Sequence, residues 1–281
     1  MHKIAAIQMR SSHLIDDNLN AAAALIQEAA SNGAKLIVLP EMFAIFGITP
    51  DDKVSQKEVL GEGKIQTFLQ EQAKRNHAWI VGGTIPIACD IPNKILATSL
   101  LINDKGEVVA AYDKIHLFDV ELSPTEIYCE SDTTKHGDTI VLADTPFGKL
   151  GMSVCYDVRF PELFRTMFNH GAEIFVIPSA FTVPTGEAHW ELLARARAVE
   201  NFSYVIGACQ GGLHSNGRKT YGHSVIIDPW GRVISKMDGV EPGVIYADID
   251  LTAVHQARKS IPVDKHQTIA FNIEKLHFSQ K

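Results

Sequence analysis

The amino-acid sequence predicts one α/β domain, and three observations support this. Short β-rich apolar runs alternate with segments whose apolar residues recur at helical spacing. No linker, low-complexity tract or change in composition divides the 281 residues. The hydrophobic fraction of 46% and the charged fraction of 21% are those of an ordinary globular chain. We therefore expect a single domain over residues 1–281, with its core at about 3–250 and a C-terminal tail at 251–281.

The first half of the chain begins with a βαβ pattern. Residues 3–9 form an apolar run that predicts a buried strand. A helix follows, which Asp16 and Asp17 can cap and which ends near Ser31, where an Asn-Gly pair is a stop signal. The other elements expected in this half are strands at 35–40 and 78–85, a helix at 64–76, and a hairpin of strands at 96–103 and 107–113.

The second half repeats this rhythm after a loop-like stretch at 114–138, which contains Pro124 and Gly137. Loops of this length in compact domains are usually functional or disordered. Pro161 is well placed for the first turn of a helix. The expected elements are strands at 149–155, 172–178, 203–209 and 243–249, helices at 161–170 and 187–200, and a hairpin of strands at 223–229 and 232–237.

The net charge and the apolar pattern argue against a nucleic-acid-binding protein and against a membrane protein. A net charge of −7 gives the chain no general attraction for phosphate backbones, so we expect no nucleic-acid partner. The apolar stretch at the N-terminus is too short for a signal peptide, and no run approaches the length that spans a bilayer. We therefore expect a cytoplasmic protein with no membrane segment.

The cysteines are far apart and form no C-x-x-C pair. Disulfide frameworks and cysteine-based zinc sites usually show paired cysteines, so neither is expected here. The chain also has no H-E-x-x-H motif. We expect no metal and no cofactor. The four residues are Cys89, Cys129, Cys155 and Cys209.

Three chemically suited residues stand at the ends of predicted strands. Glu41 directly follows the run LIVLP, Lys114 follows VVAAYD, and Cys155 ends KLGMSVC. Ligands of α/β sheets bind outside the carboxyl ends of strands, which favours one shared cleft for the three. A thiol needs a nearby base or cation to become a nucleophile. Glu41 can accept its proton, and Lys114 can lower the thiol pKa and stabilise an oxyanion.

Each of these residues also has an ordinary structural interpretation. A single cysteine at a strand end is often a small buried hydrophobe. Glu41 suits the neighbourhood of a helix N-terminus, and an isolated Lys114 suits a solvated surface. The residues alone leave the catalytic and the structural interpretations open.

Longer segments around these residues resemble the nitrilase superfamily of carbon–nitrogen hydrolases, in the family's order and over almost the whole chain. The resemblance implies a four-layer α-β-β-α sandwich that commonly dimerises, so we expect a homodimer or a higher homo-oligomer. The segments are LIVLPEMF (36–43), YDKIHLFD (112–119), GMSVCYDVRFPELFR (151–165), PSAFTVPTGEAHWELLARARAVEN (178–201) and YGHSVIIDPWGRV (221–233).

At the matching positions, the resemblance implies catalytic roles. Cys155 would be the nucleophile, Glu41 the general base and Lys114 the catalytic lysine. The family has a second glutamate that orients the lysine. Glu130 in YCESDTTKHGD is the best match for it, and Glu121 is the alternative.

The reaction implied is hydrolysis of a primary carboxamide through a thioester. Cys155 adds to the carbonyl carbon, while Lys114 and the backbone N–H of Tyr156 bind the oxyanion. Glu41 returns the proton to the departing nitrogen, ammonia leaves, and water then cleaves the thioester.

Three stretches resemble one branch of the superfamily, the deaminated glutathione amidases, which serve metabolite repair. The expected substrate is therefore the amide of a small α-keto acid, deaminated glutathione. The alternatives are an ω-amidase acting on α-ketoglutaramate and an N-carbamoyl-amine hydrolase. The stretches are HLFDVELSPTEIYCES (116–131), FTVPTGEAHWE (181–191) and ACQGGLHSNGRKTYGHS (208–224).

Substrate carboxylates need cations or amide donors. Arg159, four residues after Cys155, is the preferred candidate to bind one. Tyr156 and Phe181 are expected to wall the pocket, with core packing as the other interpretation. The remaining candidate cations are Arg195, Arg197, Arg218 and Lys219, of which the first two cannot share a helix face because they are two positions apart.

Other classes of protein stay open on the sequence. A papain-like cysteine protease would pair Cys155 with a histidine such as His116, His189 or His223, none of which lies in a protease signature. A catalytically silent interaction protein is the other class, against which the intact Glu41, Lys114 and Cys155 argue.

Overall fold

The computed structural model describes residues 1–124, 126–266 and 268. Within these residues most strands form two sheets, one of eight strands and one of six, and the other four form two small hairpins. The strands are β1 (His2–Gln8), β2 (Leu36–Val38), β3 (Trp79–Val81), β4 (Ile85–Ala88), β5 (Ile95–Ile102), β6 (Val108–Asp113), β7 (Asp119–Ser123), β8 (Glu126–Cys129), β9 (Thr134–Lys135), β10 (Leu142–Thr145), β11 (Gly148–Met152), β12 (Ile174–Val176), β13 (Tyr204–Gly207), β14 (Gly211–Leu213), β15 (Lys219–Tyr221), β16 (Val225–Ile227), β17 (Val233–Lys236) and β18 (Gly243–Ile249). The α-helices are α1 (Ile15–Ser31), α2 (Pro50–Ser55), α3 (Lys64–Asn76), α4 (Pro161–Asn169), α5 (Val183–Thr185), α6 (Glu191–Asn201), α7 (Leu251–Ser260) and α8 (Val263–His266).

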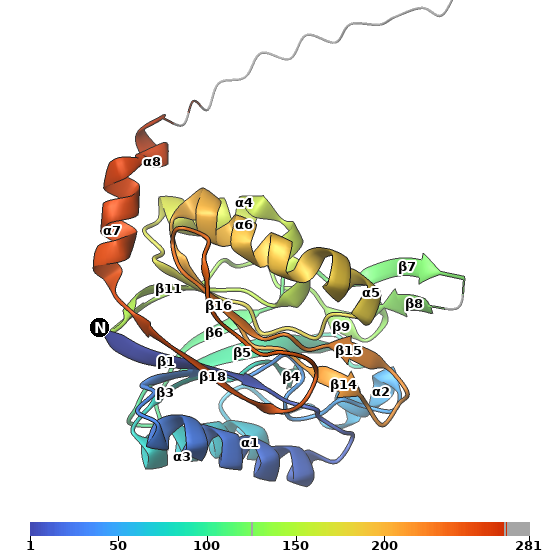
Figure 1. The fold of residues 1–281 in the computed structure, drawn as a ribbon. Coiled ribbons are helices and arrows are strands. Elements are labelled where there is room, and N and C mark those ends of the chain that lie inside the picture. The colour runs from blue at the N-terminus through green and yellow to red at the C-terminus, as the bar shows by residue number, and fades with distance from the viewer. Residues whose placement is uncertain (125, 267, 269–281) are drawn as a thin grey trace, which may run out of the picture.

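The molecule is a four-layer α-β-β-α sandwich (Figure 1). The first sheet has the order β18-β1-β2-β3-β5-β4, with β6 and β9 also paired to β5. The second sheet has the order β10-β11-β12-β13-β16-β17. Helices α1 and α3 cover the outer face of the first sheet, and α4 and α6 cover that of the second (Figure 1). The predicted four-layer sandwich is therefore confirmed.

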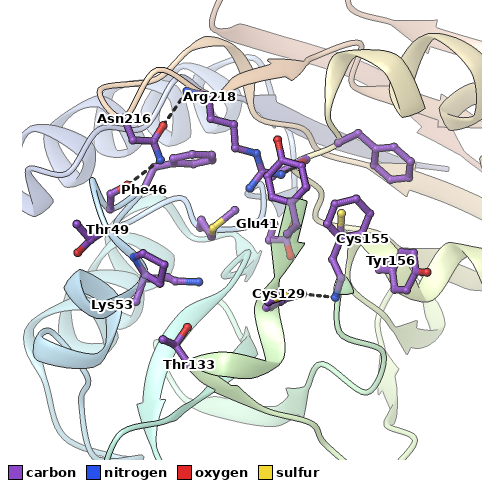
Figure 2. A pocket seen from close by; sticks show the side chains of 18 of the residues that line it. Glu41, Phe46, Thr49, Lys53, Cys129, Thr133, Cys155, Tyr156, Asn216 and Arg218 are labelled. Atoms are coloured by element: carbon purple, nitrogen blue, oxygen red, sulfur yellow. Dashed lines mark hydrogen bonds between the residues drawn. The ribbon is translucent and has the colours of Figure 1, made fainter. Parts of the chain in front are cut away.

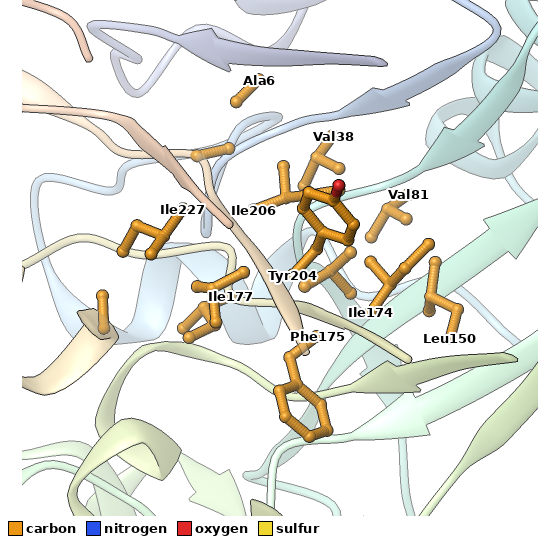
Figure 3. Packing of buried hydrophobic residues seen from close by; sticks show 14 of the residues in the cluster. Ala6, Val38, Val81, Leu150, Ile174, Phe175, Ile177, Tyr204, Ile206 and Ile227 are labelled. Carbon is orange, nitrogen blue, oxygen red and sulfur yellow. The ribbon is translucent and has the colours of Figure 1, made fainter. Parts of the chain in front are cut away.

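Period-two alternation in the strands sorts their side chains between two cores. Ile4 and Ala6 of β1 face the second sheet, whereas Ala5 and Ile7 face α1. Figure 3 shows the layer between the sheets, where Val81 lies near Ile174. Both faces of the first sheet are buried, which explains the continuous apolar runs in the sequence.

Strand direction brings the ends of β2, β6 and β11 to one end of the sandwich. In the first sheet β2 is parallel to β3, while β5 is antiparallel to both β3 and β6. Consequently β6 runs in the same direction as β2. In the second sheet β11 is parallel to β12 and β13. The residues that follow β2, β6 and β11 meet although they come from different sheets, since Glu41, Lys114 and Cys155 line one pocket.

The strand expected at 78–85 is in fact two strands, β3 and β4, which pair one after the other with β5, at Leu101–Ile102 and at Ile95–Thr98. The break falls at Gly82-Gly83, where Gly83 has a left-handed φ of +52°. A Cβ on Gly83 would lie 2.0 Å from the carbonyl oxygen of Pro40. Only glycine permits this approach, which places the turn after β3 against the residue before Glu41.

The expected long loop at 114–138 contains three short strands, β7, β8 and β9. The strand expected at 149–155 ends at Met152, and Cys155 begins a short 3₁₀ helix, Cys155–Arg159. The helix expected at 187–200 begins with one π-helical turn, Gly186–Trp190, and continues as α6 to Asn201.

The expected C-terminal tail starts with a packed helix. In α7, Val254 and Ala257 are buried, and Asp250 caps the helix by accepting the N–H of Thr252 at 3.0 Å. Residues 267 and 269–281 of that tail lie outside the described residues. Among the described helices, none has the length and apolar character needed to cross a bilayer.

Candidate active site

Cys155 lies in a sharp turn between β11 and α4. Its φ is +45°, in the left-handed region that non-glycine residues rarely occupy. Its N–H donates to the carbonyl of Pro178 at 2.9 Å. Pro161 begins α4, as the sequence predicts. A strained strand-to-helix turn of this kind presents a nucleophile at the end of a sheet.

The carboxylate of Asp157 anchors this turn. Its Oδ2 accepts the N–H of Val154 at 2.8 Å and the hydroxyl of Tyr112 at 2.7 Å. Its Oδ1 accepts the N–H of His116 at 3.1 Å, and Nδ1 of the same histidine lies 2.7 Å away. Asp157 is fully buried, so these bonds take the place of water. The turn at Cys155 is thus tied to β6 and to the segment after it.

Glu41 lies in a turn after β2 that buried polar side chains hold. The N–H of Met42, whose φ is +55°, donates to Oγ1 of Thr84 at 2.8 Å. Nε2 of Gln210 donates to the carbonyl of Glu41 at 3.0 Å and to Oγ of Ser11 at 2.8 Å. Gln210 and Ser11 are almost fully buried. The backbone of Glu41 is therefore fixed from two sides.

Lys114 joins the two predicted glutamates. Its Nζ donates to Oε1 of Glu41 at 2.8 Å and to the two carboxylate oxygens of Glu130 at 2.7 and 3.0 Å. The N–H of Phe118 also donates to Glu130, at 2.7 Å. The alternative partner, Glu121, is exposed in β7 and is not bonded to Lys114. The structure thus brings Glu130, and not Glu121, to the lysine.

Charge pairing keeps Lys114 and Glu130 ionised although both are buried. Burial alone would lower the pKa of Lys114, but Glu130 and Glu41 outweigh it and raise that pKa above its ordinary value. Burial opposes the ionised form of Glu130 too, yet Lys114, followed by Lys53, lowers the pKa of that carboxyl. Lys114 is therefore a fixed cation next to the sulfur of Cys155.

The pKa of the Cys155 thiol is raised, whereas the sequence led us to expect that Lys114 would lower it. Burial first, and then the charge of Glu41, raise its pKa well above the ordinary value. Lys114 lowers that pKa as predicted, but by less than burial raises it. The resting thiol is consequently protonated, with its proton beside Glu41. Deprotonation has to accompany attack on a substrate.

A pocket of about 320 Å³ opens over these residues (Figure 2). Glu41, Lys114, Glu130 and Cys155 all line it. The aromatic side chains that complete its walls include the predicted Tyr156 and Phe181, together with Phe46, Phe118 and Tyr128. A cavity of this size with a few convergent polar groups suits a small organic substrate.

The cations of this pocket are not those ranked first on the sequence. Arg218 and Lys53 line it, whereas Arg159 does not. The guanidinium of Arg159 lies 3.0 Å from Nδ1 of His189 and 5.9 Å from the ring centre of Tyr156. The other three candidate cations also lie elsewhere: Arg195 donates to Gly231, Arg197 donates to Val158 and pairs with Glu200, and Lys219 is exposed in β15.

The histidines considered for a protease-like pair have other partners. His116 bonds to Asp157, and His223 lies 2.7 Å from the carbonyl of Tyr221. Neither they nor His189 line the pocket. Among the residues that the structure describes, no three His, Cys, Asp or Glu side chains are grouped so that they could hold a metal ion.

Sequence reasoning missed several functional neighbours. Asp157 follows Cys155 by two positions, but nothing local distinguishes it from a polar turn residue. Lys53 lies in a short helix with no expected element around it. Gln210 carries no pattern of its own. The available signals were the positions of Asp157 and Gln210 inside segments that resemble the family.

Comparison with known proteins shows the family. Residues 3–259 match the family described as Carbon-nitrogen hydrolase. The chain is similar to a deaminated glutathione amidase of Dictyostelium discoideum, with 39% identity over 96% of this chain and 94% of the relative. It is 37% identical to omega-amidase NIT2 of Mus musculus, over 94% of each chain.

A solved structure agrees with these relatives. The crystal structure of the C. elegans NitFhit protein superimposes with a TM-score of 0.88 at 36% identity. The match covers 95% of this chain but only 65% of that longer protein. The chain therefore belongs to the carbon–nitrogen hydrolase family, and as a member it is an enzyme that hydrolyses amides.

Proposed function

We propose that this enzyme hydrolyses the amide bond of deaminated glutathione, with Cys155 as the nucleophile. The observation that supports this is the ammonium of Lys114, which lies between the carboxylates of Glu41 and Glu130 in the pocket that contains Cys155. The curated relative from Dictyostelium has that activity in its name. The four residues supply a nucleophile, a base and a fixed cation.

Acylation begins when the carbonyl carbon of the amide lies against the sulfur. Sγ of Cys155 forms a bond to that carbon as Glu41 takes the thiol proton. Lys114 and the backbone N–H of Tyr156 bind the oxyanion, while Glu130 keeps the ammonium of Lys114 in place. The carbon–nitrogen bond then breaks, and Glu41 gives its proton to the departing nitrogen.

Deacylation repeats the sequence with water. Glu41, ionised again, removes a proton from a water molecule that attacks the thioester carbon. The carbon–sulfur bond breaks, the thiolate of Cys155 recovers the proton from Glu41, and the acid leaves. A single oxyanion donor contributes about 10²–10³ in rate. Lys114 therefore serves both halves of the reaction.

The departing group depends on the amide. The expectation of a primary carboxamide that releases ammonia is wrong for deaminated glutathione, which is a secondary amide. Its amide joins a 2-oxoglutaryl unit to cysteinylglycine, so cleavage gives 2-oxoglutarate and cysteinylglycine. α-Ketoglutaramate gives the same acid and ammonia. An ammonia assay therefore detects only the second substrate, whereas 2-oxoglutarate reports on both.

The decisive experiment measures 2-oxoglutarate release from deaminated glutathione by the wild type and by Cys155→Ala. We expect turnover by the wild type and none by the variant, whose melting temperature stays near that of the wild type because the change is small. Intact-mass detection of an acyl adduct on the wild type supports the thioester. Near-normal turnover by Cys155→Ala rules the mechanism out.

A second candidate, ω-amidase activity on α-ketoglutaramate, is favoured by the similarity to the mouse enzyme of that name. The two identities, 39% and 37%, are too close to separate the substrates. The ratio of kcat/KM for deaminated glutathione to that for α-ketoglutaramate decides between them. An N-carbamoyl amine serves as the third substrate in the same assay.

The homodimer and the cytoplasmic location remain predictions. Size-exclusion chromatography with light scattering tests the first, and fractionation of cells that express the natural gene tests the second. A catalytically silent protein would show no turnover on any of the three substrates.

A further inference from the structure

Arg218 presents a guanidinium with no acidic partner among the described residues. Its Nη2 donates to the carbonyl of Ala180 at 2.9 Å. The rings of Phe46 and Tyr128 lie 5.4 and 4.8 Å from its Cζ. Its buried Nε has no hydrogen-bond partner in the structure. Two aromatic contacts hold this cation rigidly at the pocket wall, with part of its donor capacity unused.

Lys53 is a second cation on the same pocket. It is half-buried in α2, and within the described part of the chain its Nζ makes no hydrogen bond or ion pair. The carboxylate with the largest effect on the pKa of Lys53 is Glu130, which already accepts bonds from Lys114 and from the N–H of Phe118. Burial lowers the pKa of Lys53, and the charges of Lys114 and then Arg218 lower it further, against the opposite effect of Glu130 and Glu41. An anion bound between Lys53 and Arg218 would stabilise the buried charge of Lys53 and offset its repulsion from neighbouring cations.

The pocket as a whole carries an excess of positive charge. Three cations line it against two carboxylates, in a chain whose net charge is −7. Both carboxylates are bonded to Lys114, so neither Lys53 nor Arg218 is bonded to a carboxylate of the pocket, and one positive charge remains in excess. Figure 2 shows Lys53 and Arg218 reaching the cavity from positions away from Cys155. A local field of this kind concentrates anions.

We propose that Lys53 and Arg218 form a carboxylate subsite that determines specificity for amides whose acyl chain ends in a 2-oxo carboxylate. The guanidinium supplies a fixed planar donor, and the ammonium supplies a movable point charge. The amide carbon lies at Cys155 while the far end of the acyl chain lies at the two cations. This inference rests on the proposed function and adds the residues that select the acyl group.

The test compares two amides that differ only in the distal group. α-Ketoglutaramate has the carboxylate, and 4-oxopentanamide has a methyl group in its place. We expect Lys53→Met and Arg218→Met each to lower kcat/KM for α-ketoglutaramate by roughly 30-fold or more. The same variants change kcat/KM for 4-oxopentanamide by less than about 3-fold. Arg218→Lys restores part of the loss, because it returns the charge without the planar fork.

A matched control is Lys64→Met, which removes an exposed lysine paired with Asp16 outside the pocket. Exposed pairs of this kind contribute little, so both substrates should be unaffected. An equal loss on both amides for Lys53→Met would show a structural role and overturn the subsite. A loss confined to deaminated glutathione would place the cations at its leaving group and also overturn it.

A binding measurement tests the carboxylate subsite independently of the catalytic proposal. Calorimetry with 2-oxoglutarate uses Cys155→Ala and the same variant with Lys53→Met added. We expect Kd to rise by about 30-fold on addition of Lys53→Met, whatever the turnover assays give. An unchanged Kd overturns the subsite even if the enzyme is active. Conversely, turnover by Cys155→Ala refutes the mechanism while leaving this binding result intact.

Discussion

The hydroxyl of Tyr112 lies 2.7 Å from Oδ2 of Asp157, and this bond joins the two sheets at the turn that presents Cys155. Tyr112 belongs to β6 of the first sheet, and Asp157 follows β11 of the second. Both residues are fully buried. Lys114 comes two residues after Tyr112, so one bond couples the positions of Lys114 and of Cys155. Loss of this bond should affect stability and catalysis together.

Tyr112→Phe should lower the free energy of unfolding by about 1–2 kcal/mol, because Asp157 loses one buried donor. It should also lower kcat more than it raises KM, since the turn at Cys155 shifts. Urea unfolding and steady-state kinetics measure the two effects. Tyr246→Phe, which alters a hydroxyl near the surface, is the control and should stay within about 0.5 kcal/mol of the wild type. Equal stability of the two variants would contradict the coupling.

Glu130→Gln should reduce kcat by about 10² while the protein stays folded, because Gln cannot accept the same bonds from Lys114 and Phe118. Glu130 raises the pKa of Lys114, so its loss lowers that pKa. The alkaline decline of kcat should therefore begin at a lower pH than in the wild type. A pH–rate profile tests this shift, with Glu121→Gln as the neighbouring control. An unchanged profile with reduced kcat would exclude a role through the charge of Lys114.

Glu41→Gln should slow turnover but make the Cys155 thiol more acidic. Turnover should fall by about 10²–10⁴, because the base is lost. The pKa of the Cys155 thiol should fall too, since the charge of Glu41 raises it in the wild type. Thiolate absorbance near 240 nm, corrected with the matching Cys155→Ala double variant, follows the titration. A thiol midpoint at or above that of the wild type would refute this account of the electrostatics.

Periodicity predicted much of the fold because most strands and helices are buried on a regular face. Helix α3 has the residue range predicted for it, and α1 differs only at its start. The short strands β7 and β8 were not predicted, because they are only partly buried and have no apolar pattern to recognise. The division between β3 and β4 was also missed. It depends on the contact between Gly83 and Pro40, which are far apart in sequence.

The candidate site, like the fold, was only partly predictable from the sequence. Glu41, Lys114 and Cys155 were predictable because each follows a strand and lies in a segment that resembles the family. The partners of Asp157 lie 41 and 45 positions away, at His116 and Tyr112, so no local pattern predicts them. The protonated state of the thiol could not be predicted either. It depends on how deeply the fold buries the sulfur, and the sequence contains no measure of that depth.

His214 packs against Phe46 of the pocket wall, and its buried ring makes the stability of the protein depend on pH. Its ring stacks on Phe46 at 3.7 Å, and its two nitrogens lie 2.8 Å from the carbonyl of Ser11 and 2.7 Å from Oγ1 of Thr220. Burial lowers the pKa of His214 to about 4, below its ordinary value of 6.5. The folded protein therefore keeps this ring neutral at a pH where the unfolded chain protonates it.

The direction of the effect follows from that difference. Above pH 6.5 neither state of His214 is protonated, and its contribution to stability is complete. As the pH falls from 6.5 to about 4 the unfolded chain binds the extra proton, so stability declines by up to about 3 kcal/mol. Unfolding free energies at pH 7 and at pH 4.5 should therefore differ more in the wild type than in His214→Gln, which has no titrating ring. Variants at the exposed His13 should retain the wild-type difference. If His214→Gln shows the same decline as the wild type, the neutral buried ring is not its source.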